Sequence, residues 1–292
     1  MIKQRILVTG ANGQLGRELQ QLSSAYHLYD FIFLSREDLP VNHQESVKQS
    51  FKKHRPDFCI NCAAYTAVDK AETEKESAFA INGTAAGNMA AACKEYNCQF
   101  IHISTDYVFD GNAKVPYKED DVVNPQTVYG ASKLEGERQA IEFNPGSIII
   151  RTSWVYSQFG KNFVKTMLKF MSEKKEIGVV NDQYGSPTYA ADLAEAILKV
   201  VGTLTTHHSP LTTQGIYHFS NEGVISWYDF AVTIKGLTGA RCKINALSTP
   251  EYPTPAKRPA YSVLDKTKIK NTFGIVLKGW KDSLAVCLHK LE

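Results

Sequence analysis

The sequence contains little that would indicate a membrane protein or a secreted protein. No run reaches the ~18 consecutive apolar residues that cross a bilayer. The first residues read as a strand leading directly into a glycine loop, without an apolar segment followed by a small-residue cleavage site. We therefore expect a cytoplasmic protein with no membrane partner.

Charge of one sign is also scarce. The 292 residues include 33 lysines and arginines against 30 aspartates and glutamates, which leaves a formal net charge of +3. Nucleic-acid-binding domains concentrate far more positive charge on one face, so we expect no nucleic-acid partner. Glycine, with 19 residues, and proline, with 11, are near their average frequencies, which excludes a collagen-like repeat and a low-complexity linker.

Cysteine is present, but not in the pattern of a disulfide framework. Six cysteines in a chain of this length are too few to hold it together by cross-links. Cys59 and Cys62 have the CxxC spacing of redox and zinc motifs, yet no second pair of cysteines or histidines matches them. We interpret them as reduced thiols of the core.

The first half of the chain alternates short apolar runs with amphipathic segments. Strands are predicted over residues 5–9, 31–35, 58–61, 99–104 and 147–152, and helices over 14–23, 44–54, 78–96 and 127–143. Strands that are apolar on both faces indicate a parallel sheet covered by helices on each side. The sequence therefore predicts an α/β fold of the Rossmann type, with a doubly wound parallel sheet that binds ligands beyond the carboxyl ends of its strands.

The alternation weakens after Trp154, where helices, short strands and a proline-rich turn over residues 250–259 are mixed. We predict two interleaved domains. An NAD(P)-binding domain comprises residues 1–153 with parts of 188–220, and a smaller α+β substrate-binding lobe comprises 154–187 and 221–292. The sequence leaves the oligomeric state open between a monomer and a homodimer.

A glycine-rich loop follows the first predicted strand and opens the first predicted helix. Its three glycines permit a tight turn, close approach of a pyrophosphate to the backbone, and close packing of the helix on the strand. The amide groups at the helix N-terminus favour a phosphate. We therefore expect cofactor binding by the loop residues Gly10, Asn12, Gly13, Gln14, Leu15 and Gly16.

The residues after the second predicted strand bear on the choice between NADPH and NADH. An acidic side chain about 20 residues beyond the glycine loop would bind the ribose 2′-hydroxyl of NAD, whereas a basic one suits the 2′-phosphate of NADP. Arg36 occupies this region and favours NADPH. Glu37 and Asp38 follow it, so NADH stays possible.

Tyr129 and Lys133 are four residues apart on a predicted helix, so their side chains share one face. Thr105 follows a predicted strand at the edge where the sheet would present it to the same crevice. A nearby ammonium and an oxidised nicotinamide would lower the phenol pKa from ~10 toward the working pH. Thr105 would donate to the substrate oxygen on which charge develops. We interpret Thr105, Tyr129 and Lys133 as a proton-transfer site for hydride-transfer chemistry.

These motifs, together with four longer segments, resemble a known enzyme family. The glycine loop, the strand-end threonine and the Tyr–Lys pair are similar to those of the extended short-chain dehydrogenase/reductases. More specifically, four segments resemble the dTDP-4-dehydrorhamnose reductases, and the resemblance runs over residues 5–285: 62–72 (CAAYTAVDKAE), 104–109 (STDYVF), 151–156 (RTSWVY) and 182–188 (DQYGSPT).

The resemblance implies an NAD(P)H-dependent oxidoreductase of nucleotide-sugar metabolism. It would reduce the C4 ketone of dTDP-4-dehydro-β-L-rhamnose to dTDP-L-rhamnose, a precursor of cell-surface polysaccharides. In this interpretation Tyr129 protonates the C4 oxygen and Lys133 holds the nicotinamide ribose. The stretch that lines the cofactor would be Ala63, Ala64 and Tyr65. The substrate-binding residues would be Thr105, Asp106, Trp154, Gln183 and Arg258.

Three of these substrate residues have a structural alternative. Trp154 fits core packing at a strand end as well as a contact with the sugar. Arg258 fits a charge-assisted bond to the nucleotide pyrophosphate, or a solvated surface position. Gln183 fits substrate binding or stabilisation of its own loop.

The chain departs from the family pattern near residue 40. Pro40-Val41 stands where the family commonly has an aspartate and an aliphatic residue that contact adenine. Proline offers neither a carboxylate nor an N–H group, so backbone carbonyls or other groups would hold the adenine. Some relatives bind Mg²⁺ through glutamates, of which only Glu18 has an obvious counterpart, so we expect no metal site.

Three other functions compete with the reductase. A 4,6-dehydratase usually has Asp-Glu after the strand-end threonine, but here Tyr107 follows Asp106. A 4-epimerase keeps the tyrosine and lysine but retains its NAD permanently, which a site that favours NADPH argues against. A non-catalytic relative of the regulatory subunit of methionine adenosyltransferase is the third, and the intact Thr105, Tyr129 and Lys133 argue against it.

Overall fold

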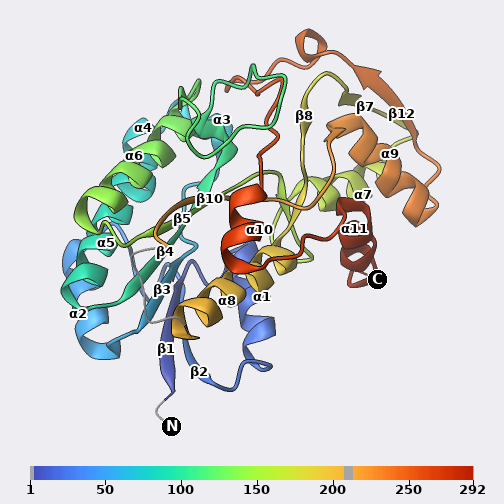
Figure 1. The fold of residues 1–292 in the computed structure, drawn as a ribbon. Helices are drawn as coiled ribbons and strands as arrows, with labels where there is room; N and C mark the ends of the chain where they lie inside the picture. Colours follow the sequence, from blue (N-terminus) through green and yellow to red (C-terminus); the bar gives the residue numbers. More distant parts are fainter. Residues whose placement is uncertain (1–2, 207–212, 292) are drawn as a thin grey trace.

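The computed structural model describes residues 3–206 and 213–291, apart from the side chain of Thr206. Its central sheet has six parallel strands in the order β10-β5-β4-β3-β1-β2 (Figure 1). The strands are β1 (Gln4–Thr9), β2 (Tyr29–Leu34), β3 (Phe58–Asn61), β4 (Gln99–Thr105), β5 (Ile148–Thr152) and β10 (Gly215–Phe219). The predicted doubly wound parallel sheet is confirmed.

The strand order reverses between β1 and β3, because the chain first builds outward to β2 and then crosses back. Such a topological switch point opens a crevice at the carboxyl ends of the two strands. The glycine loop follows β1 and the stretch beginning at Ala63 follows β3. Both predicted cofactor segments therefore start at the same place in the sheet.

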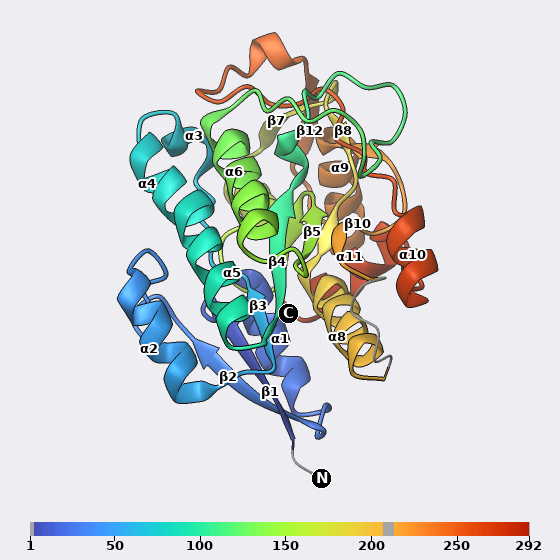
Figure 2. The ribbon, with the colours of Figure 1, turned by 60° about the vertical axis from the view of Figure 1, so that its left-hand side comes forward.

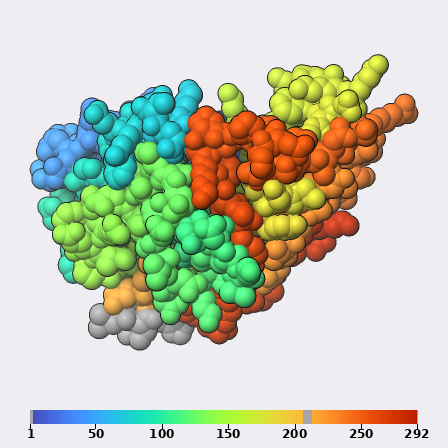
Figure 3. Space-filling model, turned by 90° about the horizontal axis from the view of Figure 1, so that it is seen from above, coloured from blue at the N-terminus to red at the C-terminus, as the bar shows by residue number. Residues whose placement is uncertain are grey.

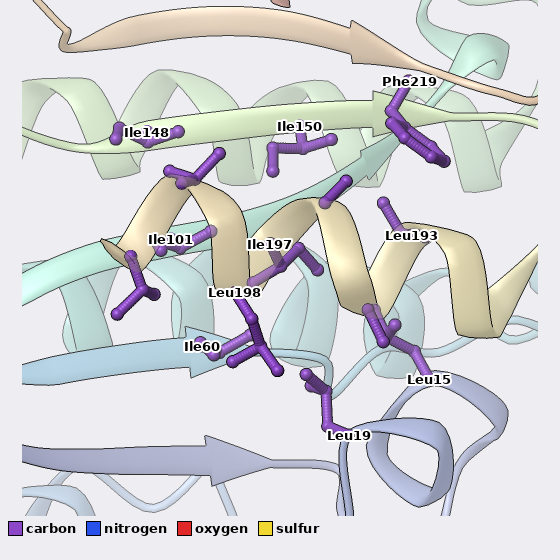
Figure 4. Close-up of a cluster of buried hydrophobic side chains, with 14 of the residues drawn as sticks. Leu15, Leu19, Ile60, Ile101, Ile148, Ile150, Leu193, Ile197, Leu198 and Phe219 are labelled. Atoms are coloured by element: carbon purple, nitrogen blue, oxygen red, sulfur yellow. The ribbon is translucent and has the colours of Figure 1, made fainter. Parts of the chain in front are cut away.

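Helices cover both faces of the sheet (Figure 2). One face carries α1 (Gln14–Ser23) and α8 (Ala190–Thr206); the other carries α2 (Gln44–His54), α5 (Ala85–Glu95) and α6 (Val128–Phe143). Figure 4 shows α8 laid along the strands with its apolar side chains facing them. Burying each such side chain stabilises the fold by about 1.5–3 kcal/mol. No helix within the described residues is both long enough and apolar enough to cross a membrane.

The helix predicted over residues 78–96 is interrupted in the structure. It consists of α4 (Lys75–Phe79), a π-helical turn (Ala80–Thr84) and α5. Such single π turns occur often at functional sites. The turn pushes the Asn82 carbonyl toward α6 at Gly136, where any side chain would collide with it. Apolar periodicity alone does not reveal such an insertion.

The rest of the chain builds a second core beside the sheet. In it α7 (Phe163–Glu173) and α9 (Trp227–Thr238) pack against the parallel pair β7 (Glu176–Val180) and β12 (Lys243–Leu247), and α11 (Trp280–His289) packs against α9. The short helices α3 (Val68–Ala71) and α10 (Thr267–Phe273) pack on elements of the first core, α3 against α6 and α10 against β10 and α8. Short strands form two further pairs, β6 (Val155–Tyr156) with β9 (Thr188–Tyr189) and β8 (Tyr184–Gly185) with β11 (Ile225–Ser226).

Candidate active site

A cavity of about 990 Å³ opens at the carboxyl ends of the central strands. It gathers residues that lie far apart in the sequence. The predicted cofactor residues that line it are Gly10, Asn12, Gly13, Gln14, Leu15, Gly16, Arg36, Ala63, Ala64, Tyr65, Tyr129 and Lys133. Three predicted substrate residues line it as well, namely Thr105, Asp106 and Trp154.

The glycine loop has the close backbone packing that a dinucleotide groove requires. Gly10 has a φ of +63°, and a Cβ there would lie 2.8 Å from the carbonyl group of Cys62 and the nitrogen of Ala63. A Cβ on Gly16 would lie 2.5 Å from the carbonyl oxygen of Gly10. Only glycine fits at these positions. The resulting groove ends at the N-terminus of α1, whose amide groups and dipole suit a pyrophosphate.

The turn after β2 leaves Arg36 as the polar side chain best placed for a ribose phosphate. The Asp38 carboxylate accepts a hydrogen bond from the Ser35 backbone nitrogen at 2.9 Å. Hydrogen bonds from Ser35 lower the pKa of both Glu37 and Asp38. Asp38 thus serves the turn, whereas Arg36 and Glu37 are both exposed and line the cavity. Of these two, only Arg36 carries the charge that suits a phosphate.

The unusual Pro40-Val41 pair also lines this end of the cavity. Leu39 precedes it and lines the same wall, and both Leu39 and Val41 are buried. The three residues offer an apolar surface to a flat ring. This part of the cavity wall is therefore apolar.

Two capping bonds fix the first turn of α6, which carries Tyr129. The Thr127 hydroxyl accepts from the Gly130 nitrogen at 3.0 Å, and the Glu72 carboxylate accepts from the Val128 nitrogen at 3.0 Å. Such caps satisfy helix-end amides that otherwise lack partners. The position of the Tyr129 ring is therefore set by the turn and not only by its packing.

Burial raises the pKa of the Tyr129 phenol to about 12, and a hydrogen bond with Thr105 lowers it by less. Tyr129 is therefore a protonated phenol at neutral pH and is able to donate a proton. The direction is opposite to the lowering expected from a neighbouring ammonium. The reason is that the Lys133 amine points elsewhere, with Nζ donating to the Ile103 carbonyl oxygen at 2.6 Å.

Lys133 is almost completely buried, with 2% of its surface exposed. Besides Ile103, its Nζ contacts His102, whose Nε2 atom is 3.3 Å away. Burial lowers the Lys133 pKa to about 8, against smaller opposing effects of Glu137 and Cys62. The amine thus titrates close to the physiological range.

The end of β4 brings Thr105 and Asp106 to the cavity. The Thr105 hydroxyl donates to the Asp106 carboxylate at 3.0 Å and accepts from the Tyr107 nitrogen at 3.3 Å. Burial raises the pKa of Asp106 to about 6, against smaller lowering by the nearby hydroxyls of Ser262 and Thr105. Thr105 thus lies between the Tyr129 phenol and a carboxyl group that is a weaker acid than usual.

Trp154 is both packed and part of the cavity wall. Its ring stacks on Trp227 with centroids 3.4 Å apart and planes at 9°. Gly185 makes room for it, since a Cβ there would lie 2.5 Å from the indole. Its φ of +47° is a rare conformation for a bulky residue, of the kind that clusters at functional sites. Both rings line the cavity, and nothing local in the sequence points to Trp227.

Arg258 lines a second cavity of about 520 Å³, which shares Tyr107 with the first. Its Nη2 donates to the Asp69 carboxylate at 2.6 Å, and its Nη1 is buried with no hydrogen-bond partner among the described residues. Figure 3 shows the segment around residues 250–260, in orange-red, crossing the upper surface between the two halves of the molecule. Arg258 thus lies beside the active-site cavity and not in it.

The structure does not bring Gln183 to either cavity. Its side chain is buried, and Nε2 donates to the Thr249 hydroxyl at 3.0 Å. The bond ties two loops together. This placement favours the loop-stabilising alternative over substrate binding.

Asn82 is a site residue that the sequence did not indicate. Its Oδ1 accepts from the Tyr65 nitrogen at 2.8 Å, and its Nδ2 donates to the Tyr65 carbonyl oxygen and the Ser132 hydroxyl, both at 3.0 Å. It thereby fixes the stretch after β3 to α6. Its position depends on the π turn, which has no local sequence signal.

Among the described residues, no three histidine, cysteine, aspartate or glutamate side chains are grouped to hold a metal ion. The Glu18 carboxylate instead accepts from the Ser157 hydroxyl at 2.5 Å. The absence of a metal site stays a prediction. All six cysteines are free thiols, and Cys59 is fully buried.

Comparison with known proteins identifies the family. A family model described as the RmlD substrate binding domain matches residues 4–292. The chain belongs to this family of dTDP-4-dehydrorhamnose reductases. It is 42% identical over 286 residues to the dTDP-4-dehydrorhamnose reductase of Aggregatibacter actinomycetemcomitans, which covers 96% of this chain and 97% of the relative. The resemblance noted from the sequence motifs is confirmed.

Solved structures of the RmlD family share the fold over the whole chain. A dTDP-4-dehydrorhamnose reductase from Clostridium acetobutylicum superposes with a TM-score of 0.92 at 44% identity, covering 98% of this chain and 99% of that one. The Bacillus anthracis reductase, solved in complex with NADP, also gives a TM-score of 0.92, at 38% identity and with 99% and 100% coverage. The RmlD-family fold and the architecture described above are the same.

Proposed function

We propose that this chain reduces the C4 ketone of dTDP-4-dehydro-β-L-rhamnose to dTDP-L-rhamnose at the expense of NADPH. The observation that carries the proposal is the convergence of the glycine groove, Thr105, Tyr129 and Lys133 on one cavity at the topological switch point. Full-length relatives that bear this enzyme name support it.

The cavity fits a dinucleotide cofactor, which supplies the hydride when bound. The groove at Gly10 and Gly16 would hold the pyrophosphate, because its backbone packing leaves no space for side chains there. Arg36 would bind the 2′-phosphate of NADPH, in accord with the NADP complex of the Bacillus anthracis relative. NADH would lack this contact.

The chain's own residues supply the rest of the chemistry. Tyr129, a phenol at neutral pH, donates its proton to the C4 oxygen as negative charge develops there. Thr105 orients the same oxygen, and Lys133 holds the cofactor ribose. Trp154 and Trp227 form an aromatic wall for the sugar, and the unpaired Nη1 of Arg258 would bind the substrate pyrophosphate from the adjoining cavity.

The same proposal assigns a role to each part of the chain. Residues 1–153 with parts of 188–220 would bind the cofactor, and residues 154–187 and 221–292 would bind the nucleotide sugar. The two separate cores and the return of α8 and β10 to the central sheet support this division. The enzyme would work in the cytoplasm as a monomer or a homodimer.

A substrate assay with the purified protein tests the proposal. We expect loss of reduced-nicotinamide absorbance, with one NADPH consumed per dTDP-4-dehydro-L-rhamnose, and formation of dTDP-L-rhamnose. An epimerase would convert nucleotide sugars without net NADPH oxidation, and a regulatory subunit would do neither. Either outcome, with a known reductase active in the same assay, would refute the proposed reaction.

A further inference from the structure

A row of buried polar side chains crosses the sheet beneath the active-site cavity. Thr9 of β1, Asn61 of β3 and His102 of β4 are direct neighbours in the strand register, and each is at most 2% exposed. Two residues earlier on the same face, the corresponding layer is apolar, with Leu7, Cys59 and Phe100. Buried polar groups require hydrogen-bond partners, so the bonds along this row define it.

The bonds run unbroken from the glycine loop to the catalytic lysine. The Thr9 hydroxyl donates to Asn61 Oδ1 at 2.7 Å, and the Ala63 nitrogen donates to the same oxygen at 3.2 Å. Asn61 Nδ2 lies 3.0 Å from His102 Nδ1, and His102 Nε2 lies 3.3 Å from Lys133 Nζ. Each end of the chain is therefore at a part of the proposed site.

These contacts determine the tautomer of His102. The Ala63 nitrogen is only a donor, so the Asn61 amide must face it with its oxygen and face His102 with its NH₂ group. His102 Nδ1 must then accept. Burial lowers the His102 pKa well below its usual value, so the ring is neutral and carries its proton on Nε2.

The Nε2–H group therefore points at Lys133 Nζ. An ammonium has three donors and no acceptor, so it cannot receive this hydrogen bond, whereas a neutral amine can. The neutral amine also donates to the Ile103 carbonyl oxygen. The hydrogen-bond pattern is complete only when Lys133 is uncharged.

The other ionisable groups around Lys133 do not determine its charge in the way that His102 does. Glu137 on the same helix is committed to Arg151 of β5, with Nη2 and Oε2 2.7 Å apart. Burial raises the pKa of the Cys62 thiol, so it stays neutral. Tyr129, one turn away, is a neutral phenol. His102 is thus the ionisable side chain whose N–H group faces the Lys133 amine.

We propose that His102 is a positioning residue of the reductase site: Asn61 fixes its tautomer, and its Nε2–H group holds Lys133 in place and favours the neutral amine over the ammonium. The proposal rests on the function proposed above. It assigns a task to a histidine that does not reach the cavity and links the charge of Lys133 to the strand that precedes the glycine loop.

The substitution Asn61→Asp tests the proposal, because a carboxylate keeps the shape of the amide but accepts where the amide donates. His102 Nδ1 must then carry the proton, and Nε2 becomes an acceptor for the Lys133 ammonium. Because the ammonium gains an acceptor, we expect the pH limit of kcat/KM at which Lys133 changes its charge to rise by at least one unit. Thr9→Val is the matched control. It removes two bonds at the far end of the row, to Asn61 Oδ1 and from the Ala63 nitrogen, but leaves Ala63 bonded to Asn61 and the His102 tautomer unchanged, so its pH limit should not move.

A measurement on the free protein separates this proposal from the proposed reaction. Protonated and unprotonated ring nitrogens have distinct ¹⁵N shifts, so NMR of protein labelled at histidine nitrogens reports the tautomer, with His102→Phe used to assign the signal. We expect an Nε2-protonated ring in the natural sequence and an Nδ1-protonated ring in Asn61→Asp.

Three results would overturn the role of His102. An Nδ1-protonated or doubly protonated ring in the unaltered protein would do so. So would an unchanged pH limit in a folded Asn61→Asp variant, or an equal shift in Thr9→Val. Loss of the reductase activity itself would leave the NMR result readable, so the two proposals fail separately.

Discussion

The guanidinium group of Arg258 lies on the carboxylate of Asp69, with Nη2 2.6 Å from Oδ2, although the two residues are 189 positions apart in the sequence. The bond fastens the proline-rich turn to α3, close to the cofactor-lining stretch after β3. It uses one side of a planar, forked cation and leaves Nη1 without a hydrogen-bond partner among the residues that the structure describes. A bidentate anion such as a pyrophosphate suits the remaining donor.

Replacing Arg258 should therefore weaken binding of the nucleotide sugar and leave binding of the cofactor unchanged. For Arg258→Ala we expect the substrate KM to rise by roughly 10–100-fold, the range of one charged hydrogen bond of about 1.5–3 kcal/mol, with an unchanged Kd for NADPH. Asp69→Asn is the control: it weakens the ion pair but keeps the guanidinium, so its KM should change less. Equal losses in both variants would assign Arg258 to the fold alone.

Tyr129→Phe should separate binding from chemistry. The variant removes the proton donor and keeps the ring, so we expect an unchanged NADPH Kd and a kcat lower by roughly 10²–10⁴-fold. Titration of NADPH fluorescence and steady-state assays measure the two quantities. Near-normal turnover would mean that another acid, such as Asp106, protonates the substrate.

The parts of the site that the sequence predicts are those whose signal is local. Gly10 and Gly16 are separated by a fixed spacing at a strand–helix junction, and Tyr129 and Lys133 by one helical turn. Asn82 could not be found in this way, because its role depends on a π turn that periodicity does not reveal. Trp227 and His102 depend on tertiary packing and strand register, which bring together residues that are distant in the chain.

The pKa of Tyr129 shows a second limit of prediction from the sequence. The spacing of Tyr129 and Lys133 correctly places both on one face of α6, and it predicts a lowered phenol pKa. It does not show that the lysine is turned into the sheet toward Ile103, nor how far burial raises the pKa of the phenol. Burial and side-chain direction come from the assembled fold.

Arg36 should decide the preference between the two cofactors. In Arg36→Ala we expect the Kd for NADPH to rise by at least tenfold while that for NADH changes little, because only NADPH carries the 2′-phosphate. Equilibrium titrations with each dinucleotide provide the ratio. Lys3→Ala, far from the cavity, serves as a control for loss of a positive charge. An unchanged ratio in the Arg36 variant would show that the phosphate is bound elsewhere.

The stacked pair Trp154–Trp227 should contribute to sugar binding. For Trp154→Ala we expect a higher substrate KM and an unchanged Kd for NADPH. We also expect the substrate to quench the tryptophan fluorescence of the variant less than that of the unaltered protein. Loss of this partly buried aromatic also costs stability, at most the roughly 3–5 kcal/mol of a fully buried one, so the variant is assayed well below its Tm. Trp280→Ala, in the second core but not in the cavity wall, is the matched control. A comparable change of KM in the control would attribute the effect to the core.

The raised pKa of Asp106 predicts a pH dependence of stability with a defined sign. The folded protein binds this proton up to about pH 6, whereas the unfolded chain releases it near the usual value of 3.8. Folding is therefore favoured by the protonated carboxyl at low pH, and this contribution is lost as the pH rises from about 4 to about 6.

Asp106→Asn mimics the neutral form. The free energy of unfolding of the variant, relative to the unaltered protein, should increase by about 3 kcal/mol across this window and then stay constant. Urea unfolding at several pH values measures the difference. Asp182→Asn provides a control of opposite sign, because hydrogen bonds from Thr249 outweigh burial and lower the Asp182 pKa. This variant should lose relative stability as the pH rises toward about 3.8 and show a nearly constant difference above it. A flat difference for Asp106→Asn would show that its carboxyl is ionised in the folded state throughout.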